Sequence, residues 1–172
     1  MPVRRPADVQ VRRSTLQARV ERVAELVNAE PTEPWVLWCG LNDEATALAK
    51  MLPGSVNVSG ANSVEEKADR LLRFADGDIR VLITKPSLAA FGLNWQHCAR
   101  MAFVGLNDSY EAYYQAIRRC YRYGQTRPVH AHVVLSDLEG QIAVNIARKE
   151  REATSVMDEL VREMRTAKET TP

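Results

Sequence analysis

Two arginines and a glutamine in this sequence have the types and the spacing to bind phosphate oxygens. Gln115, Arg119 and Arg122 are four and three residues apart within the segment QAIRRCYRYGQ. At roughly 100° per residue these positions share one stripe of a helix, while Ile117 and Cys120 fall on nearly the opposite face. Arginine stays charged and its planar fork matches phosphate geometry, so this pair could stabilise charge on a transferring phosphoryl group.

The same segment has recognisable helix ends. Asp108 can cap the first turn, with Glu111 three residues later as in a capping box. Gly124 suits the position at which a chain turns out of a helix. We therefore expect a rigid helix that presents both arginines. The alternative is an amphipathic helix whose arginines are simply solvated.

The arginine segment resembles the last conserved motif of superfamily-two helicases and translocases. That motif has a Gln, then Arg-x-x-Arg, and in the Swi/Snf-type branch a closing Gly-Gln. The matching residues here are Gln115, Arg119, Arg122, Gly124 and Gln125, and Arg118 stands where many helicases carry Gly. The resemblance implies that Arg119 and Arg122 are catalytic arginine fingers for ATP bound on a separate lobe, and that Gln115 takes part in ATP binding.

An upstream stretch, VLITKPSLAAFGLNWQ, is similar to the preceding motif of that family, in which a strand ending in Ser or Thr leads into a loop with Gly-x-Asn. The resemblance implies that Thr84 and Lys85 contact nucleic-acid phosphates. It also implies that Gly92 and Asn94 belong to the ATP site. The chain departs from the family at residues 89–91, where Ala-Ala-Phe replaces residues that are often glycine.

Alternating elements must position these motifs. Apolar periodicity predicts helices at residues 16–29, 43–51 and 64–74, and strands at residues 35–39, 55–58, 80–84, 101–105 and 129–135. Strands with helices between them imply a parallel sheet that is covered on both faces. The sequence therefore predicts an α/β fold. The resemblance specifies a RecA-like three-layer sandwich with a mainly parallel central sheet, helices on both faces and a C-terminal helical extension.

Loops that leave the carboxyl ends of the strands are where such a fold binds ligands. Asn42 follows the first predicted strand, and Ser59 and Gly60 follow the second. Thr84 ends the third predicted strand, and Lys85 follows it. We expect these five residues to form the nucleic-acid-binding face.

Three parts are expected along the chain. Residues 1–12 are predicted to be a linker, residues 13–137 the lobe, and residues 138–172 the helical extension. The extension is predicted to form one long helix or two shorter ones. Its segment LEGQIAVNIARKE resembles the family's segment that returns toward the first lobe, and a coiled or solvated tail is the alternative.

Composition sets further limits. Lys and Arg number 23 against 22 Asp and Glu, so the net charge of +1 gives nucleic-acid binding little weight by itself. The three cysteines are widely spaced and lack a CxxC pair, which predicts neither a disulfide framework nor a bound metal. No apolar run approaches transmembrane length and no signal peptide is recognisable. We expect a cytoplasmic protein with no membrane partner.

Neither a phosphate-binding loop of the form G-x-x-x-x-G-K-[ST] nor an Asp-Glu motif after a strand occurs in the sequence. ATP and Mg²⁺ are therefore expected to be held mainly by a separate first lobe, and this chain alone is not expected to hydrolyse ATP. The resemblance, closest to phage and prophage members, implies the second motor lobe of an ATP-dependent DNA helicase or translocase in a bacterial cell or a phage-infected host. Its partners would be an N-terminal RecA-like lobe, in cis or in trans, and the DNA backbone.

A different class of function stays open beside this one. A catalytically silent module with the same fold could bind nucleic acid or a partner protein. The family includes enzymes for DNA and for RNA, and both strand-separating and strand-tracking motors. The Swi/Snf-type branch favours translocation on double-stranded DNA.

Overall fold

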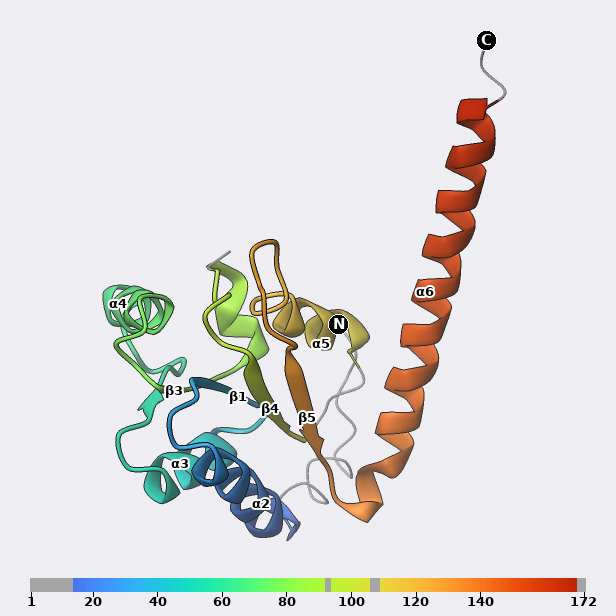
Figure 1. The fold of residues 1–172 in the computed structure, drawn as a ribbon. Coiled ribbons are helices and arrows are strands. Elements are labelled where there is room, and N and C mark those ends of the chain that lie inside the picture. The colour runs from blue at the N-terminus through green and yellow to red at the C-terminus, as the bar shows by residue number, and fades with distance from the viewer. Residues whose placement is uncertain (1–13, 92–93, 106–108, 170–172) are drawn as a thin grey trace.

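The computed structural model describes residues 14–91, 94–105 and 109–169. Its centre is a sheet in the order β2-β3-β1-β4-β5, in which every pair of neighbouring strands is parallel (Figure 1). The strands are β1 (Trp35–Cys39), β2 (Val56–Asn57), β3 (Val81–Thr84), β4 (Arg100–Val104) and β5 (His130–Val134). This confirms the predicted α/β fold, and the sheet is parallel throughout the described strands.

The central strands β1 and β3 are buried along their whole length because both faces of the sheet are covered. All five residues of β1 are buried, as are all four of β3. β1 lies between β3 and β4, with Trp35 in register with both Val81 and Arg100. Sequence periodicity therefore located these strands to within a residue at each end.

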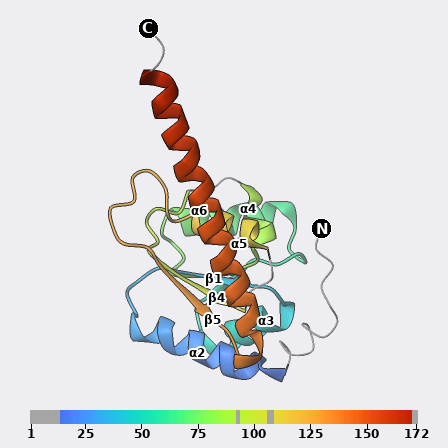
Figure 2. The ribbon, with the colours of Figure 1, turned by 90° about the vertical axis from the view of Figure 1, so that its right-hand side faces the viewer.

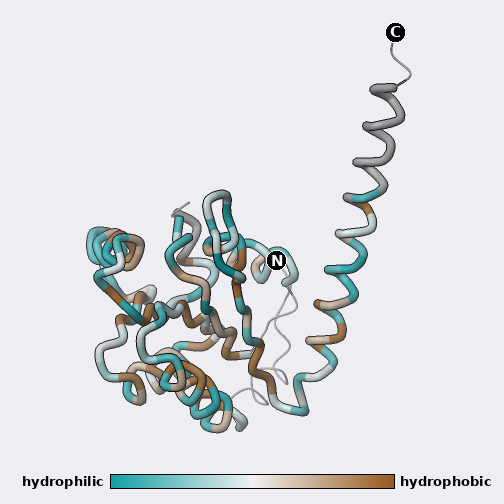
Figure 3. Tube along the Cα trace, viewed as in Figure 1, coloured by the Kyte–Doolittle hydropathy of each residue, from teal (hydrophilic) through white to brown (hydrophobic). Residues whose placement is uncertain are grey.

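One face of the sheet is covered by α2 (Leu16–Ala29) and α3 (Asn42–Met51). The apolar stripe of α2, which includes Val20, Val23 and Val27, is completely buried with Leu48 of α3. Hydrophobic colour gathers on the central strands and on these two helices in Figure 3. The first layer is thus the one that the spacing of apolar residues predicts.

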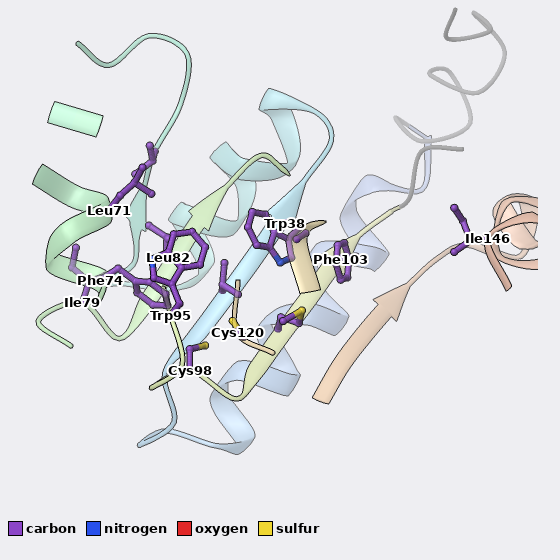
Figure 4. Packing of buried hydrophobic residues seen from close by; sticks show 14 residues of the cluster. Trp38, Leu71, Phe74, Ile79, Leu82, Trp95, Cys98, Phe103, Cys120 and Ile146 are labelled. Atoms are coloured by element: carbon purple, nitrogen blue, oxygen red, sulfur yellow. The ribbon is translucent and has the colours of Figure 1, made fainter. Parts of the chain in front are cut away.

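The other face is covered by α4 (Val64–Ala75) and α5 (Tyr110–Ile117). Its core is aromatic: the ring centroids of Trp38 and Trp95 lie 5.8 Å apart, and Phe74 meets Trp95 edge-on at 5.3 Å (Figure 4). Such edge-to-face pairs add to the stabilisation from burial. Together the two covered faces make the expected three-layer sandwich.

After β5, a short 3-10 turn, η2 (Asp137–Glu139), leads into α6 (Gly140–Glu169). The structure thus selects the single long helix from the two predicted alternatives. Ile146 packs into the aromatic core, whereas residues 151–156 are exposed and α6 runs away from the sheet (Figures 1 and 2). Within the described part of the chain, no helix has the length and apolar character needed to cross a bilayer.

Two expectations for the arginine helix are wrong. α5 ends at Ile117, so Arg119 and Arg122 lie in the turns that follow it and not on a helical stripe. The amino-terminal cap is Ser109, whose Oγ accepts a hydrogen bond from the backbone N–H of Ala112 at 3.2 Å. Residues 1–12, Gly92 and Asp108 lie outside the described residues.

Candidate functional site

A hollow of about 590 Å³ opens at the carboxyl ends of β1, β2 and β3. The residues that line it include all five that the sequence predicts for the nucleic-acid face: Asn42, Ser59, Gly60, Thr84 and Lys85. These residues come from three loops that are far apart in the sequence. The parallel order of the strands brings them together, as expected for an open α/β sheet.

Thr84 gives this hollow an unused hydrogen-bonding group. Its side chain is 1% exposed, and its Oγ1 has no hydrogen-bond partner in the structure. A buried hydroxyl without a partner is costly, and most such groups in proteins are satisfied. A bound ligand that offers oxygen or N–H groups would satisfy it, and this favours a polar ligand.

Two features of the hollow could attract an anion, while the carboxylates of Asp43 and Glu44 lie in the first turn of the same helix, α3. Lys85 lines it directly, and Asn42 is the first residue of α3, so the positive end of that helix lies at the same edge. Leu41, at the cap position, provides no side-chain hydrogen bond to this helix end. Helix amino termini are common binding sites for phosphate groups.

A buried ion pair fixes the loop that carries Asn42, and the sequence analysis missed it. Glu44 Oε2 accepts hydrogen bonds from the backbone N–H groups of Gly40 at 2.9 Å and Leu41 at 2.8 Å. Glu44 Oε1 lies 2.8 Å from Arg19 Nη1, and both side chains are at least 98% buried. A signal was present, because Arg19 falls on the apolar stripe of α2, where a charge requires a partner.

The same arginine reaches a third segment. Arg19 Nε lies 3.4 Å from Glu139 Oε2, at the turn that begins α6. Glu139 Oε2 also accepts hydrogen bonds from Ser136 N and Oγ, both at 3.0 Å. One buried guanidinium therefore joins α2, the loop before α3 and the start of α6.

Ser59 has a local role at the rim of the hollow. Its backbone N–H donates to Asn62 Oδ1 at 2.9 Å, and its Oγ lies 3.4 Å from the same atom. Both donors are used within the loop, so Ser59 fixes the conformation of the loop at the rim and has no donor left for a ligand. Gly60 leaves the rim open, since a Cβ added there would meet no atom within 4 Å.

The predicted ATP-site residues gather elsewhere. The turns that follow α5 and carry Arg119 and Arg122 are called the arginine turns here. Trp95 donates its backbone N–H to the carbonyl of Arg119 at 2.9 Å, which places Asn94 beside these turns. Gln125 Nε2 donates to the carbonyls of Gln96, Cys98 and Cys120 at 2.8, 3.2 and 3.3 Å. The two sequence motifs therefore lie side by side, although residues 97–114 separate them in the sequence.

Gly124 shows why a glycine closes this segment. Its φ is +93°, a conformation that residues with a Cβ rarely adopt. A Cβ there would also lie only 2.7 Å from Gln96 Oε1. The Gly-Gln pair at the end of the motif thus has a structural role: Gly124 allows the turn, and the hydrogen bonds of Gln125 hold the arginine turns in place.

Two buried thiols meet beneath the same segment. Cys98 and Cys120 lie together in the core (Figure 4), and a hydrogen bond between them lowers the pKa of Cys98 and raises that of Cys120. Cys98 Sγ also donates to the carbonyls of Arg100 at 3.1 Å and Pro34 at 3.3 Å. These contacts hold the arginine turns against the start of β4. Within the described residues, no group of His, Cys, Asp and Glu is placed to hold a metal ion.

The two arginines differ in their surroundings. Arg119 is partly buried, and burial together with the nearby charge of Arg122 lowers its pKa. No carboxylate in the described part of the chain pairs with Arg119, whereas Arg127 binds Glu33 at 2.8 Å. Arg122 is exposed, and so is Gln115 on α5. A partly buried guanidinium without a carboxylate partner is suited to an external phosphate.

The arginine turns and the hollow lie toward opposite ends of the strands. Gln125 and Arg127 bind Cys98 and Glu33, which precede the amino ends of β4 and β1. The hollow opens where β1, β2 and β3 end. The described residues predicted for the ATP site and those predicted for the nucleic-acid face therefore lie on separate parts of the molecule.

Comparisons with known proteins agree with this architecture. Residues 18–124 match the family described as helicase conserved C-terminal domain. A solved structure described as the C-terminal part of the Fun30 ATPase domain is similar, with a TM-score of 0.66 and 17% sequence identity. The match covers 74% of this chain and 45% of that chain, so this chain spans less than half of that structure. No curated protein sequence matches the chain.

Proposed function

The chain belongs to the helicase conserved C-terminal domain family, and we propose that it is the second motor lobe of an ATP-dependent DNA helicase or translocase of the Swi/Snf-type branch. Its fold is that of a RecA-like C-terminal lobe. The observation that carries the proposal is the pairing of an anion-receptive hollow with a separate turn that holds Arg119 without a carboxylate partner. We place the motor in the cytoplasm of a bacterial cell or a phage-infected host.

Arg119 and Arg122 would contact the phosphates of ATP that is held, with Mg²⁺, mainly by the first lobe. Asn94, beside the arginine turns, and Gln115 and Gly92 would complete this lobe's side of the nucleotide site. The fit rests on the chemistry of Arg119, whose guanidinium is partly desolvated and has no carboxylate to compete with a phosphate. Desolvation strengthens such charge–charge contacts.

The hollow would grip the DNA backbone. Lys85, the buried hydroxyl of Thr84 and the amino end of α3 offer the donors that phosphate oxygens need. Such contacts carry no sequence information, so we expect salt-sensitive binding that is largely independent of base sequence. The first lobe would be supplied in cis or in trans.

Closure of the two lobes would couple these surfaces. The arginines can stabilise charge that develops on the phosphates only when the lobes are closed, so turnover requires closure. Because the hollow holds the backbone meanwhile, each cycle would shift the lobes along one strand. Distinct surfaces for nucleotide and DNA are what this mechanism requires.

The proposal is tested by the Arg122→Ala variant in the complete two-lobed motor. Removing an arginine finger should lower DNA-stimulated ATP turnover by a factor of roughly 10³ to 10⁵. The affinity for DNA should stay nearly unchanged, because Arg122 lies away from the hollow. Arg148→Ala, in an exposed ion pair on α6, is the matched control. Turnover indifferent to Arg122 would instead favour the catalytically silent binding module.

A further inference from the structure

We propose that α4 is the second wall of the DNA-binding hollow and that its Lys67 contacts a backbone phosphate across from Lys85. This inference rests on the proposed function and assigns a DNA contact to a helix that neither sequence motif includes. It follows from three features at the rim of the hollow.

The first feature is the position of Lys67. Its Nζ donates to the carbonyl of Gly60 at 3.3 Å, and Gly60 lines the hollow. An ammonium group has three donors, so this bond leaves two for a ligand. The carbonyl therefore holds the charge of Lys67 at the rim without using up its hydrogen-bonding capacity.

The second feature is that nearby acid does not form an ion pair with Lys67. Its neighbour Glu66 accepts hydrogen bonds from Ser63 N at 3.0 Å and Asn62 Nδ2 at 3.3 Å, which hold the carboxylate at the cap of α4. Within the described residues, no carboxylate lies within ion-pair distance of Lys67 Nζ. The charge of Lys67 thus remains directed to an external anion.

The third feature is how α4 is fastened to the strand beneath it. Arg70 Nη1 donates to the carbonyl of Asn57 at 2.8 Å, at the end of β2. The side chain of Asn57 lines the hollow, and its buried Oδ1 has no partner. Arg70 is therefore a positioning residue: it holds this wall in place, and Lys67 makes the contact.

The two walls are arranged to face one strand of nucleic acid. β2 and β3 are neighbours in the sheet, with Asn57 in register with Ile83, so the loops after them leave side by side. One loop is followed by α4 with Lys67, and the other contributes Thr84 and Lys85. Lys85 lines the hollow and Lys67 lies at the carbonyl of Gly60 on its rim, so these two cations and the unsatisfied hydroxyl of Thr84 would complement a sugar–phosphate backbone.

Salt dependence of DNA binding tests the contact directly. The probe is a fluorescently labelled DNA duplex, titrated with the 172-residue chain at several salt concentrations. Lys67→Ala should weaken binding and reduce the slope of log K against log salt by about one, as loss of one phosphate contact does. Lys67→Arg should retain the slope. Arg73→Ala removes a cation from an exposed face of the same helix and should change neither quantity.

Lys85→Ala separates failure of this inference from failure of the proposed function. If Lys85→Ala weakens binding while Lys67→Ala binds as the unsubstituted chain does, α4 is not a wall of the site, but the hollow still grips DNA. If neither substitution changes binding or its salt slope, the DNA grip itself is wrong and the inference falls with it. Circular dichroism of each variant verifies that the fold is intact.

Discussion

The backbone N–H of Trp95 donates to the carbonyl of Arg119 at 2.9 Å, and this bond joins the two motifs of the chain. Trp95 is completely buried between Trp38 and Phe74, so it anchors the arginine turn to the aromatic core. The carbonyl that would continue a helix is instead used by a residue from a distant segment. α5 itself ends earlier, where the backbone N–H groups of Arg119 and Cys120 donate to the carbonyls three residues back, those of Ala116 at 3.2 Å and Ile117 at 3.1 Å.

Arg119→Lys should abolish most of the turnover of the two-lobed motor although it keeps the positive charge. A lysine lacks the planar fork that binds two phosphate oxygens at once, so the substitution removes the bidentate contact and keeps the positive charge. Steady-state ATP hydrolysis with saturating DNA measures the effect. We expect a loss of at least about tenfold. Activity equal to that of the unsubstituted motor would contradict a bidentate role.

Gln125→Ala should lower the free energy of unfolding by roughly 2 to 3 kcal/mol, because three carbonyls lose their shared donor. Denaturant unfolding followed by circular dichroism measures this change. Gln141→Ala, on the exposed side of α6, should have almost no effect. A small effect at Gln125 would show that the arginine turns are held by the core alone.

Gly124→Ala should destabilise the chain by about 1 to 2 kcal/mol because its backbone lies at positive φ. Gly60→Ala is the matched control: its φ is not positive and an added Cβ meets no atom within 4 Å. Thermal unfolding of both variants gives the comparison. Equal stabilities for the two would contradict the strained turn at Gly124.

Glu44→Gln should destabilise the fold by roughly 3 to 5 kcal/mol, since it leaves the buried Arg19 without its closest charge partner. The exposed pair of Arg22 and Glu25 on α2, also at 2.8 Å, provides the contrast. There, Glu25→Gln should change stability by less than about 1 kcal/mol. Urea unfolding of the two variants distinguishes a structural ion pair from a surface one.

Stability should fall as the pH drops below the ordinary histidine pKa of 6.5. Burial, with the charge of Arg127, lowers the pKa of His97 in the folded chain, and burial also lowers that of His132. The unfolded chain therefore binds protons first, so stability is full above pH 6.5 and is lost as the pH falls toward the lowered values. Urea midpoints between pH 8 and pH 5 test this. The double substitution His97→Gln with His132→Gln should flatten the profile.

Local patterns were sufficient to predict the strands and the hollow. Continuous apolar runs located β1 and β3, and the rule that ligands bind at the carboxyl ends of parallel strands brought Asn42 and Thr84 together before any coordinates. Both inferences depend only on residues that are near one another in the sequence. The structure places the five residues around one hollow, and their binding of nucleic acid stays a prediction.

Contacts between distant segments were beyond the reach of those patterns. The residues from Arg118 to Tyr123 all tolerate a helix, so local propensity does not show that α5 ends at Ile117. The bond from Trp95 to Arg119 joins the arginine turns to a distant segment. The pairing of Arg19 with Glu44 and the position of Lys67 over Gly60 likewise join segments whose proximity the fold creates. Sequence periodicity carries no information about such contacts.

The cluster of Arg19, Glu44 and Glu139 has an evolutionary consequence. Each of these side chains is at least 98% buried, and one guanidinium serves two carboxylates, so the loss of Arg19 removes the counter-charge that Glu44 and Glu139 share in the interior. A substitution at one position therefore costs stability, and an apolar replacement of the whole set can offset that cost. Related lobes with this packing should therefore retain or exchange the three positions together.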